Sequence, residues 1–216
     1  MIPTMLTTIE KQFPLTAINP GSYRNMKVRG MKFHIQAFYA EGLGHVSCMT
    51  ASGFFGLMKM DTLIITPTAV DMPLFSYDRV LAMGNDTLIF ELYDTLLGET
   101  DLSALDAVKK KYRALPDHDL GQHWYDSIKL PVSLSKKGKK SRTFTFNVTA
   151  EEYLSAFLST AHSAPPCEST TKLEKSSVYV EGLLKNGGPS TDIFKKGIGT
   201  EKTSDLFRRI LFGTAR

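Results

Sequence analysis

Apolar and polar residues alternate along the first half of this chain in the period-two pattern of half-buried β-strands. The stretch from Lys32 to Tyr39 shows the alternation most clearly. The alternate positions that would share one face of this strand are Phe33, Ile35 and Ala37. Those that would share the opposite face are His34, Gln36 and Phe38. Similar runs recur from Arg24 to Tyr93, and the short turn segments between them favour antiparallel pairing.

The strands expected after the first cover residues 45–51, 57–66, 74–83 and 87–93. Gly84-Asn85 marks a tight turn between the last two of them. These runs predict a sheet that is built from consecutive hairpins.

Beyond Gly98 the apolar spacing changes to the three and four of amphipathic helices. Leu102, Leu105 and Val108 lie on one face of a helix predicted over residues 101–113. The sequence Thr149-Ala-Glu-Glu152 has the capping-box pattern, so a helix is expected to begin there and to include residues 153–158. The remaining helices are predicted over residues 2–12, over 168–185 and, as two short segments split at 197–199, near the C-terminus.

The order of these elements predicts the fold class. A strand-rich half followed by a helix-rich half is typical of α+β proteins, in which helices pack on an antiparallel sheet. We expect the helices from Thr149 onward to cover one face of that sheet. The basic stretch from Ser135 to Ser141 is predicted to be a charged loop within one domain that spans residues 1–216.

The composition is that of a globular protein, with 216 residues, 42% of them hydrophobic and 22% charged. No apolar run approaches the ~20 residues of a membrane span, and the N-terminus lacks the pattern of a signal peptide. Cys48 and Cys167 have no metal-ligand spacing, and we expect two reduced thiols in a cytoplasmic protein.

The formal net charge is +4, and the excess of basic residues is clustered. The clusters are Lys109–Arg113, Lys136–Arg142, Lys195-Lys196 and Arg208-Arg209. A basic face attracts nucleic acid, a membrane surface or an acidic redox protein. Aromatic residues do not interleave with the clusters and no nucleic-acid module occurs, so nucleic acid is the weakest of the three. Ordinary solvated surface is the alternative interpretation.

Two carboxylates, Asp61 and Asp78, stand at the ends of strand-forming segments. If the two strands pair as neighbours, both side chains could face one side of the sheet. Burial and a second nearby carboxylate raise the pKa of a carboxyl group, which would let one Asp stay protonated near neutral pH and donate a proton. The alternative is that both residues cap strands or turns at the surface, and spacing alone favours that alternative.

Other candidate sites are weaker. His34 and Gln36 share a strand face and could line a pocket, although the residues alone favour a partly buried His with a backbone partner. His118 and His123 lie in a Gly-containing loop without zinc-type spacing, so no metal is expected. The sequence has no Gly-rich phosphate loop after a strand and no Gly-x-Ser-x-Gly motif, which removes the usual nucleotide, flavin and serine-hydrolase signatures.

The segment Asp71-Met-Pro-Leu-Phe-Ser-Tyr-Asp78 resembles the Asp-Leu-Pro-Ile-Phe-Gly-x-Asp segment of the ferredoxin-dependent bilin reductases. Further similarities lie in Phe33-His-Ile-Gln36, in Glu91-Leu-Tyr-Asp94 and in the ending from Gly197 to Phe212. The order and spacing of these motifs together carry the resemblance. The related red chlorophyll catabolite reductases fit about as well.

The resemblance implies a three-layer α/β/α sandwich that holds a linear tetrapyrrole between the sheet and the C-terminal helices. It implies no bound metal or flavin, because electrons come singly from reduced ferredoxin while the protein supplies protons and orientation. An acidic ferredoxin or flavodoxin would suit the basic clusters. Asp78 would be the main proton donor, assisted by Asp61 and His34. The residues expected to bind or orient the tetrapyrrole are Gln36, Phe38 and Phe75.

Three departures from the family bear on the reaction. Gln36 stands where Glu would supply an acid, Gly187-Gly188-Pro189 replaces an Asn-Asp-Pro sequence, and the chain is shorter than typical members. A tetrapyrrole-binding or carrier protein of the same fold that has lost catalysis is therefore a second hypothesis. A third is an unrelated α+β protein, in which Asp71–Phe75 is only the start of a strand.

Overall fold

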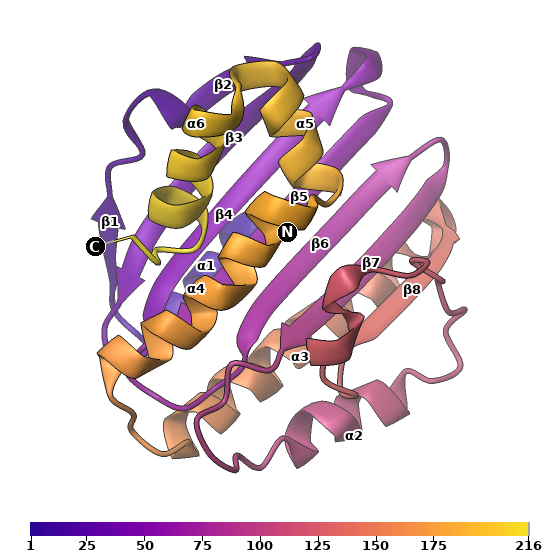
Figure 1. Ribbon diagram of the computed structural model, residues 1–216. Helices are drawn as coiled ribbons and strands as arrows, with labels where there is room; N and C mark the ends of the chain where they lie inside the picture. The colour runs from indigo at the N-terminus through magenta and orange to yellow at the C-terminus, as the bar shows by residue number, and fades with distance from the viewer. Residues whose placement is uncertain (216) are drawn as a thin grey trace.

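An antiparallel sheet of eight strands lies at the centre of the computed structural model, which describes residues 1–215 (Figure 1). The strands are hydrogen-bonded in the order β1-β3-β4-β5-β6-β7-β8, and β2 pairs with the first residues of β3. From β3 to β7 each strand pairs with the next one in the sequence, as short connections favour. The strands are β1 (Leu15–Ile18), β2 (Asn25–Val28), β3 (Met31–Ala40), β4 (Gly44–Gly53), β5 (Met58–Pro67), β6 (Leu74–Ala82), β7 (Asn85–Tyr93) and β8 (Leu134–Lys139).

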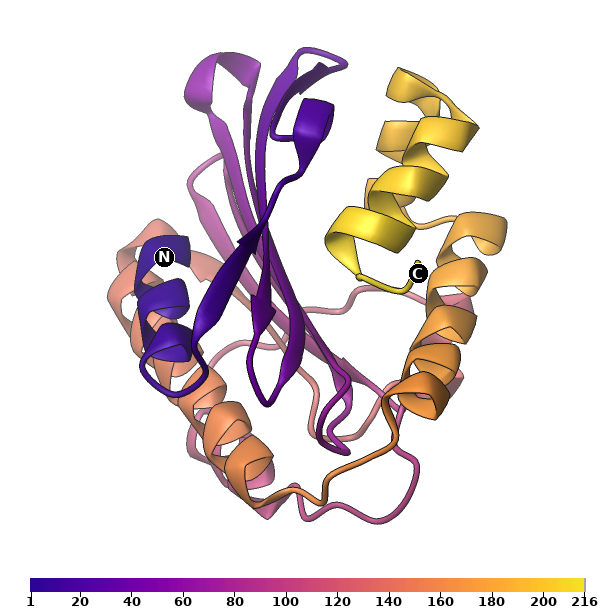
Figure 2. The ribbon, with the colours of Figure 1, turned by 90° about the vertical axis from the view of Figure 1, so that its left-hand side faces the viewer.

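Helices cover both faces of the sheet, so the molecule has three layers (Figure 2). The face that we call the N-terminal face is covered by α1 (Ile2–Glu10), α3 (Thr143–Ser163) and, beside α3, α2 (Ser103–Lys111). The opposite face, the C-terminal face, is covered by α4 (Ser169–Asn186), α5 (Pro189–Ile198), α6 (Thr200–Asp205) and the π-helical turn η5 (Leu206–Leu211). The predicted α+β class with a central antiparallel sheet is confirmed. The expectation that the helices from Thr149 onward share one face is wrong, because α3 lies on the N-terminal face.

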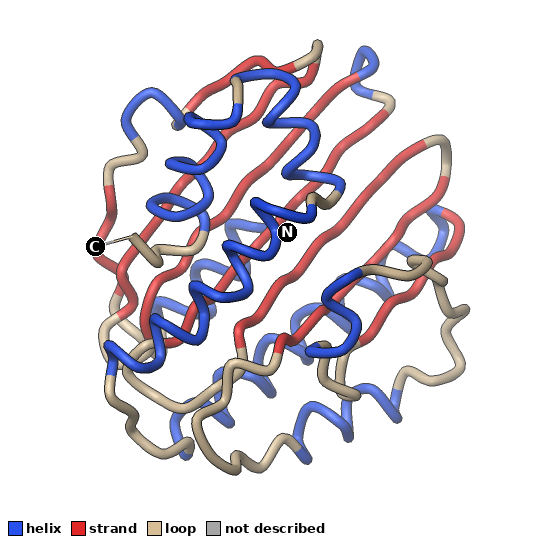
Figure 3. The backbone as a smooth tube through the Cα atoms, viewed as in Figure 1, coloured by secondary structure: helices blue, strands red, loops and turns tan. Residues whose placement is uncertain are grey.

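Strands form the central layer of the molecule, with helices in front of it and behind it (Figure 3). Strands β1 to β7 follow one another along the chain, and β8 lies among the helices that come after them. The prediction of a charged loop from Ser135 to Ser141 is wrong, because the first part of this stretch belongs to the edge strand β8. The side chain of Lys136 is buried there, and its Nζ donates to the Leu115 carbonyl at 2.8 Å and to Asp117 Oδ1 at 2.6 Å. The basic composition of this stretch suggests an exposed loop, but the stretch forms a strand in which Lys136 has hydrogen-bond partners inside the fold.

The helix predicted from the capping-box pattern exists, but Thr149 is not its cap. Helix α3 begins at Thr143, and the Thr149 hydroxyl lies inside it and donates to the Thr145 carbonyl at 2.9 Å. A buried Ser or Thr can make this bond within a helix, so the pattern does not mark a helix start by itself. No helix within residues 1–215 is long and apolar enough to cross a membrane.

Alternate strand residues enter two separate cores, one on each side of the sheet. On the N-terminal face, Phe75 and Phe90 pack against Tyr153 and Phe157 of α3, with the Phe75 and Phe157 rings 4.7 Å apart. On the C-terminal face, Phe33 of β3 packs against Phe194 of α5 at 5.0 Å. The side of the sheet on which a residue lies therefore decides which helices it contacts.

Candidate functional site

The two carboxylates singled out in the sequence lie on opposite faces of the sheet. Strands β5 and β6 are neighbours, but Asp61 pairs with Arg79 while Thr62 pairs with Asp78. Because successive side chains alternate between faces, Asp61 points to the N-terminal face and Asp78 to the C-terminal face. The predicted Asp61–Asp78 pair is therefore wrong.

His34 lies on the same side of the sheet as Asp61. Both residues line a shallow groove at the uncovered end of the N-terminal face. His34 is exposed, with Nδ1 2.7 Å from Asn25 Oδ1, and Asp61 Oδ2 lies 3.8 Å from the amino group of Met1. The structure brings these two predicted residues near each other but separates both from Asp78.

The three residues expected to bind a ligand also face away from Asp78. Gln36 pairs with Cys48 and Phe38 pairs with Val46, on the rows that continue into the core of the N-terminal face. Phe75 is fully buried in that core. Period-two alternation puts all three on the side of the sheet opposite to Asp78, so none of them reaches the cavity described next.

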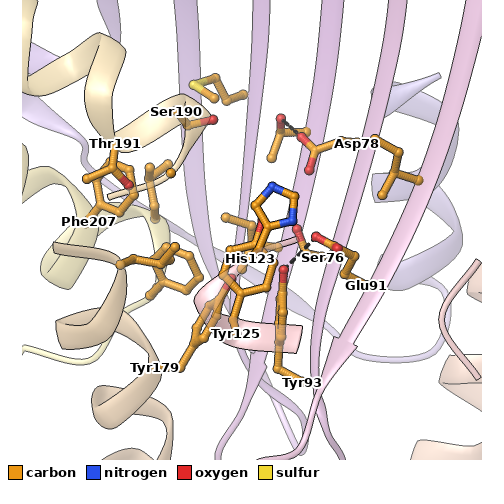
Figure 4. Close-up of a pocket in the computed structure, with 18 of the residues that line it drawn as sticks. Ser76, Asp78, Glu91, Tyr93, His123, Tyr125, Tyr179, Ser190, Thr191 and Phe207 are labelled. Atoms are coloured by element: carbon orange, nitrogen blue, oxygen red, sulfur yellow. Dashed lines mark hydrogen bonds between the residues drawn. The ribbon is translucent and has the colours of Figure 1, made fainter. Parts of the chain in front are cut away.

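A cavity of about 270 Å³ lies between the C-terminal face of the sheet and the helices that cover it (Figure 4). Its floor comes from β4 to β7, and its walls come from α4, α5, η5 and the turn after residue 120. Its polar lining residues are Thr62, Ser76, Asp78, Glu91, Tyr93, His123, Tyr125, Tyr179, Ser190 and Thr191. An apolar cavity with a few convergent polar groups is the usual form of a small-molecule site.

Asp78 is the half-buried carboxylate in the floor of this cavity. Burial raises the pKa of Asp78 to about 6; the hydrogen bond that Thr62 Oγ1 donates to Oδ1 opposes this shift, and the negative charge of Glu91 adds to it. The aromatic neighbours Phe75 and Tyr77 do not cause this burial, because their rings lie on the other face of the sheet. The helices over the C-terminal face cause the desolvation instead.

Glu91 is a second carboxylate in the same floor, which the sequence analysis did not identify as a site residue. It lies on β7 directly across from Ser76, one step along the strand pair from Asp78. The Tyr93 hydroxyl donates to Glu91 Oε2 at 2.6 Å. Glu91 Oε1 is 3.5 Å from Lys129 Nζ but has no hydrogen-bond partner within the described residues, so it can accept a bond from a ligand.

His123 enters the cavity from the turn that precedes the short helix η3 (Trp124–Ile128). Its ring stacks on Tyr125 at 4.8 Å, and Nδ1 is buried without a hydrogen-bond partner in the part of the chain that the structure describes. In Figure 4 the ring lies above the sheet in front of Ser76 and Glu91. Trp124 holds this turn against α4, because its indole packs so closely on Gly182 that no larger residue would fit there.

Stacked tyrosines form one wall of the cavity. The rings of Tyr93 and Tyr179 are 4.1 Å apart, and Tyr125 meets Tyr93 edge-on at 5.5 Å. Burial raises the pKa of all three phenols above the ordinary value, so they stay protonated and remain hydrogen-bond donors at neutral pH. The wall offers flat apolar surface with polar tips, which suits a planar conjugated ligand.

Asp71, the first residue of the Asp71–Asp78 segment, has a structural role, because its carboxylate binds groups of the fold. Its carboxylate accepts bonds from the backbone N–H groups of Leu97 and Gly98 and from Nζ of the fully buried Lys172 at 2.7 Å. Burial raises its pKa, but these donors outweigh burial and hold the pKa below the ordinary value. The segment thus joins α4 to the sheet at one end and places Asp78 in the cavity at the other.

The cavity is suited to proton transfer to an apolar ligand. A carboxyl group whose pKa is near neutrality can donate a proton and regain it from solvent. Within residues 1–215 no group of three or more His, Cys, Asp or Glu side chains is placed to hold a metal ion. The residues that line the cavity supply proton donors, hydrogen-bond acceptors and stacking surface.

Asp78 should make the native protein less stable as the pH rises. Its pKa is 3.8 ordinarily and about 6 in the fold, so between these values the native state binds more protons than the unfolded state. Stability is then lost as the pH rises from about 4 through 6, by about 2–3 kcal/mol from this group. Asp78→Asn should remove that loss, so denaturant titrations should find the variant more stable at pH 7 and nearly equal at pH 4. An equal stability of the two proteins at both pH values would contradict the raised pKa.

No protein-family model matches this sequence, and no curated protein matches it. Among solved structures, the fold is similar to that of phytochromobilin synthase from tomato, whose selenomethionine form was crystallised in complex with biliverdin. The TM-score is 0.78, over 99% of this chain and 82% of the tomato chain, and 14% of the residues are identical. At this identity the similarity shows that the two proteins share a fold.

Proposed function

We propose that this chain binds a linear tetrapyrrole in the cavity on the C-terminal face and reduces it, with Asp78 as proton donor. The observation that carries the proposal is a half-buried Asp with a pKa near 6 in the floor of an apolar cavity between the sheet and the C-terminal helices. The tomato protein of the same fold was crystallised with biliverdin, a ligand of this class. The stacked tyrosines offer flat surface to such a conjugated system.

Reduction of one double bond consumes two electrons and two protons. Asp78 would supply one proton. The second has a candidate source in the group formed by Glu91, Tyr93 and His123, on the same side of the sheet. The cavity residues provide protons but no electron carrier, so we propose that an external one-electron donor such as reduced ferredoxin supplies the electrons.

Gly188 favours a second function, that of a tetrapyrrole carrier. It lines the cavity at the start of α5, where it provides no side chain to act as an acid. A carrier would need the cavity and its aromatic wall but not a proton donor with a raised pKa. The position of Asp78 is therefore what makes the reductase our first choice.

The first experiment is to mix the purified protein with biliverdin and to record the visible absorption spectrum. Binding in the cavity should shift the bilin bands, and Ser190→Trp, which places an indole in the cavity, should abolish the shift. Val178→Trp, on the exposed side of α4, is the matched control and should bind normally. Adding reduced ferredoxin without oxygen then separates the two functions: a new reduced product supports the reductase, and an unchanged bound bilin supports the carrier. No spectral shift with biliverdin would contradict both.

Turnover with ferredoxin should fall steeply as salt rises from low to physiological concentration. An acidic donor would dock on basic residues drawn from Lys109–Arg113, Lys137–Arg142 or Lys195-Lys196. Salt at physiological strength limits the reach of such charges to ~8 Å, which slows encounter more than it weakens contact. Initial rates at a series of salt concentrations test this, with bilin binding as the salt-insensitive control. A rate that does not depend on salt would show that these clusters are ordinary surface.

A further inference from the structure

One end of the sheet carries four exposed turns that lie side by side. A single row of paired residues crosses the sheet from β2 to β8. Its members are Lys27, Lys32, Ser52, Lys59, Leu81, Asp86 and Gly138. The turns beyond this row therefore lie at the same end, as the hairpins at the top of Figure 1 show. We call the segments Lys27–Lys32, Ser52–Lys59, Leu81–Asn85 and Gly138–Phe144 together the hairpin-tip surface.

Large apolar side chains project from this surface. Those exposed to solvent are Phe54, Phe55, Leu57, Met83 and Phe144, and Phe55 is fully exposed. An exposed apolar group of this size on a small protein usually marks an interaction site.

The turn between β4 and β5 is unusual because two phenylalanines, Phe54 and Phe55, form it. Phe54 and Phe55 have φ values of 50° and 56°, in the left-handed region that hairpin turns normally fill with Asn and Gly. A bulky residue in this conformation is strained, and neither side chain is buried in the fold. Most of the Phe54 side chain and all of the Phe55 side chain are exposed, so their apolar surface is free for a partner.

The charge of the surface is of one sign. Its four segments contain no Asp or Glu, and their seven exposed cations are Lys27, Arg29, Lys32, Lys59, Lys139, Lys140 and Arg142. None of the seven forms a salt bridge within residues 1–215. Lys27, Lys32 and Lys59 also line the open groove that contains His34 and Asp61, so three cations gather beside the turns.

We propose that the hairpin-tip surface docks on an anionic lipid bilayer. Protruding turns with apolar apices match the layered structure of a membrane interface, in which aromatic and aliphatic side chains enter below the headgroups. The surrounding cations would meet the phosphate and carboxylate groups of the lipids. The apolar side chains project beyond the cations that surround them, as insertion below the headgroups requires. A flat acidic protein would offer Phe54 and Phe55 no recess to occupy.

Sedimentation with phospholipid vesicles tests the proposal. The protein should bind vesicles of phosphatidylcholine mixed with phosphatidylserine, should bind pure phosphatidylcholine far less, and should be released by salt. Phe55→Ser should lower the partition coefficient by about 10-fold through the lost apolar burial. Lys32→Gln with Lys59→Gln should lower it by roughly five-fold for each lysine. These residues are exposed, so thermal melts should show unchanged folding.

Tyr39→Ser is the matched control, because Tyr39 is an exposed aromatic residue at the opposite end of β3 from Lys32. It should bind vesicles as the unchanged protein does. The proposal is overturned if phosphatidylserine vesicles do not bind, or if the Phe55 and lysine variants bind them normally. It is also overturned if the lysine variants weaken binding of an acidic ferredoxin while vesicles never bind, since the surface would then be a protein docking site.

Discussion

Asp78→Asn is expected to bind biliverdin like the unchanged protein and to reduce it about 10²–10⁴-fold more slowly, the usual contribution of general acid catalysis. The substitution keeps the size of the side chain, and its amide oxygen can still accept the bond that Thr62 donates. What it removes is the titrating proton of Asp78, whose pKa of about 6 lets the carboxyl group donate a proton and regain it near neutral pH. Single-turnover kinetics with reduced ferredoxin measure the rate, and the absorption shift on mixing measures binding.

The register of β5 and β6 provides a matched control for this experiment. Asp61→Asn changes the same side chain on the neighbouring strand but on the opposite face of the sheet. It should therefore reduce bilin at the unchanged rate. If Asp61→Asn were as slow as Asp78→Asn, the cavity would be the wrong site. If Asp78→Asn kept the full rate, the carrier function would gain support.

The antiparallel sheet could be predicted from the sequence, because alternation and short turns are local signals. The same signals were sufficient to find Glu91. The two-residue loop Met83-Gly84 sets the register of β6 against β7, one residue before the turn expected at Gly84-Asn85, because Ala82 pairs with Asn85. This register places Glu91 across from Ser76 and on the face of Asp78. A turn at Gly84-Asn85 would place Glu91 across from Asp78 and on the same face, so the sequence contains the signal that both carboxylates face one side.

The position of Asp61 relative to Asp78 could not be predicted in this way. Residues 68–73 join β5 to β6, and a connection of that length does not fix which residues pair. Packing against the two helical layers sets the register, and a shift of one residue would reverse the face of every side chain. The position of His123 in the cavity could not be predicted for a similar reason, because the contact of Trp124 with Gly182 of α4, far along the chain, holds its turn in place.

Asp86→Ala is expected to lower the free energy of unfolding by about 3–5 kcal/mol, the usual cost of removing one partner of a buried ion pair. Asp86 is fully buried and binds Arg79 through two bonds, at 2.5 Å to Nε and 2.6 Å to Nη2. Burial lowers the pKa of Arg79, but Asp86 outweighs burial and holds the pKa above the ordinary value. Without Asp86 the guanidinium stays charged in the core beside Phe146, with a neutral partner in Asn147.

Two further variants show whether the cost comes from an unpaired buried charge. Asp106→Ala breaks an exposed ion pair with Lys110 on α2 and should change stability by less than about 1 kcal/mol. Arg79→Met combined with Asp86→Leu removes both charges and should recover most of the loss, because apolar residues can replace a buried pair. Urea titrations of the four proteins measure these differences. If the double variant were as unstable as Asp86→Ala, the ion pair would matter for its geometry, as a clamp that joins β6 and β7 to α3 behind Asp78.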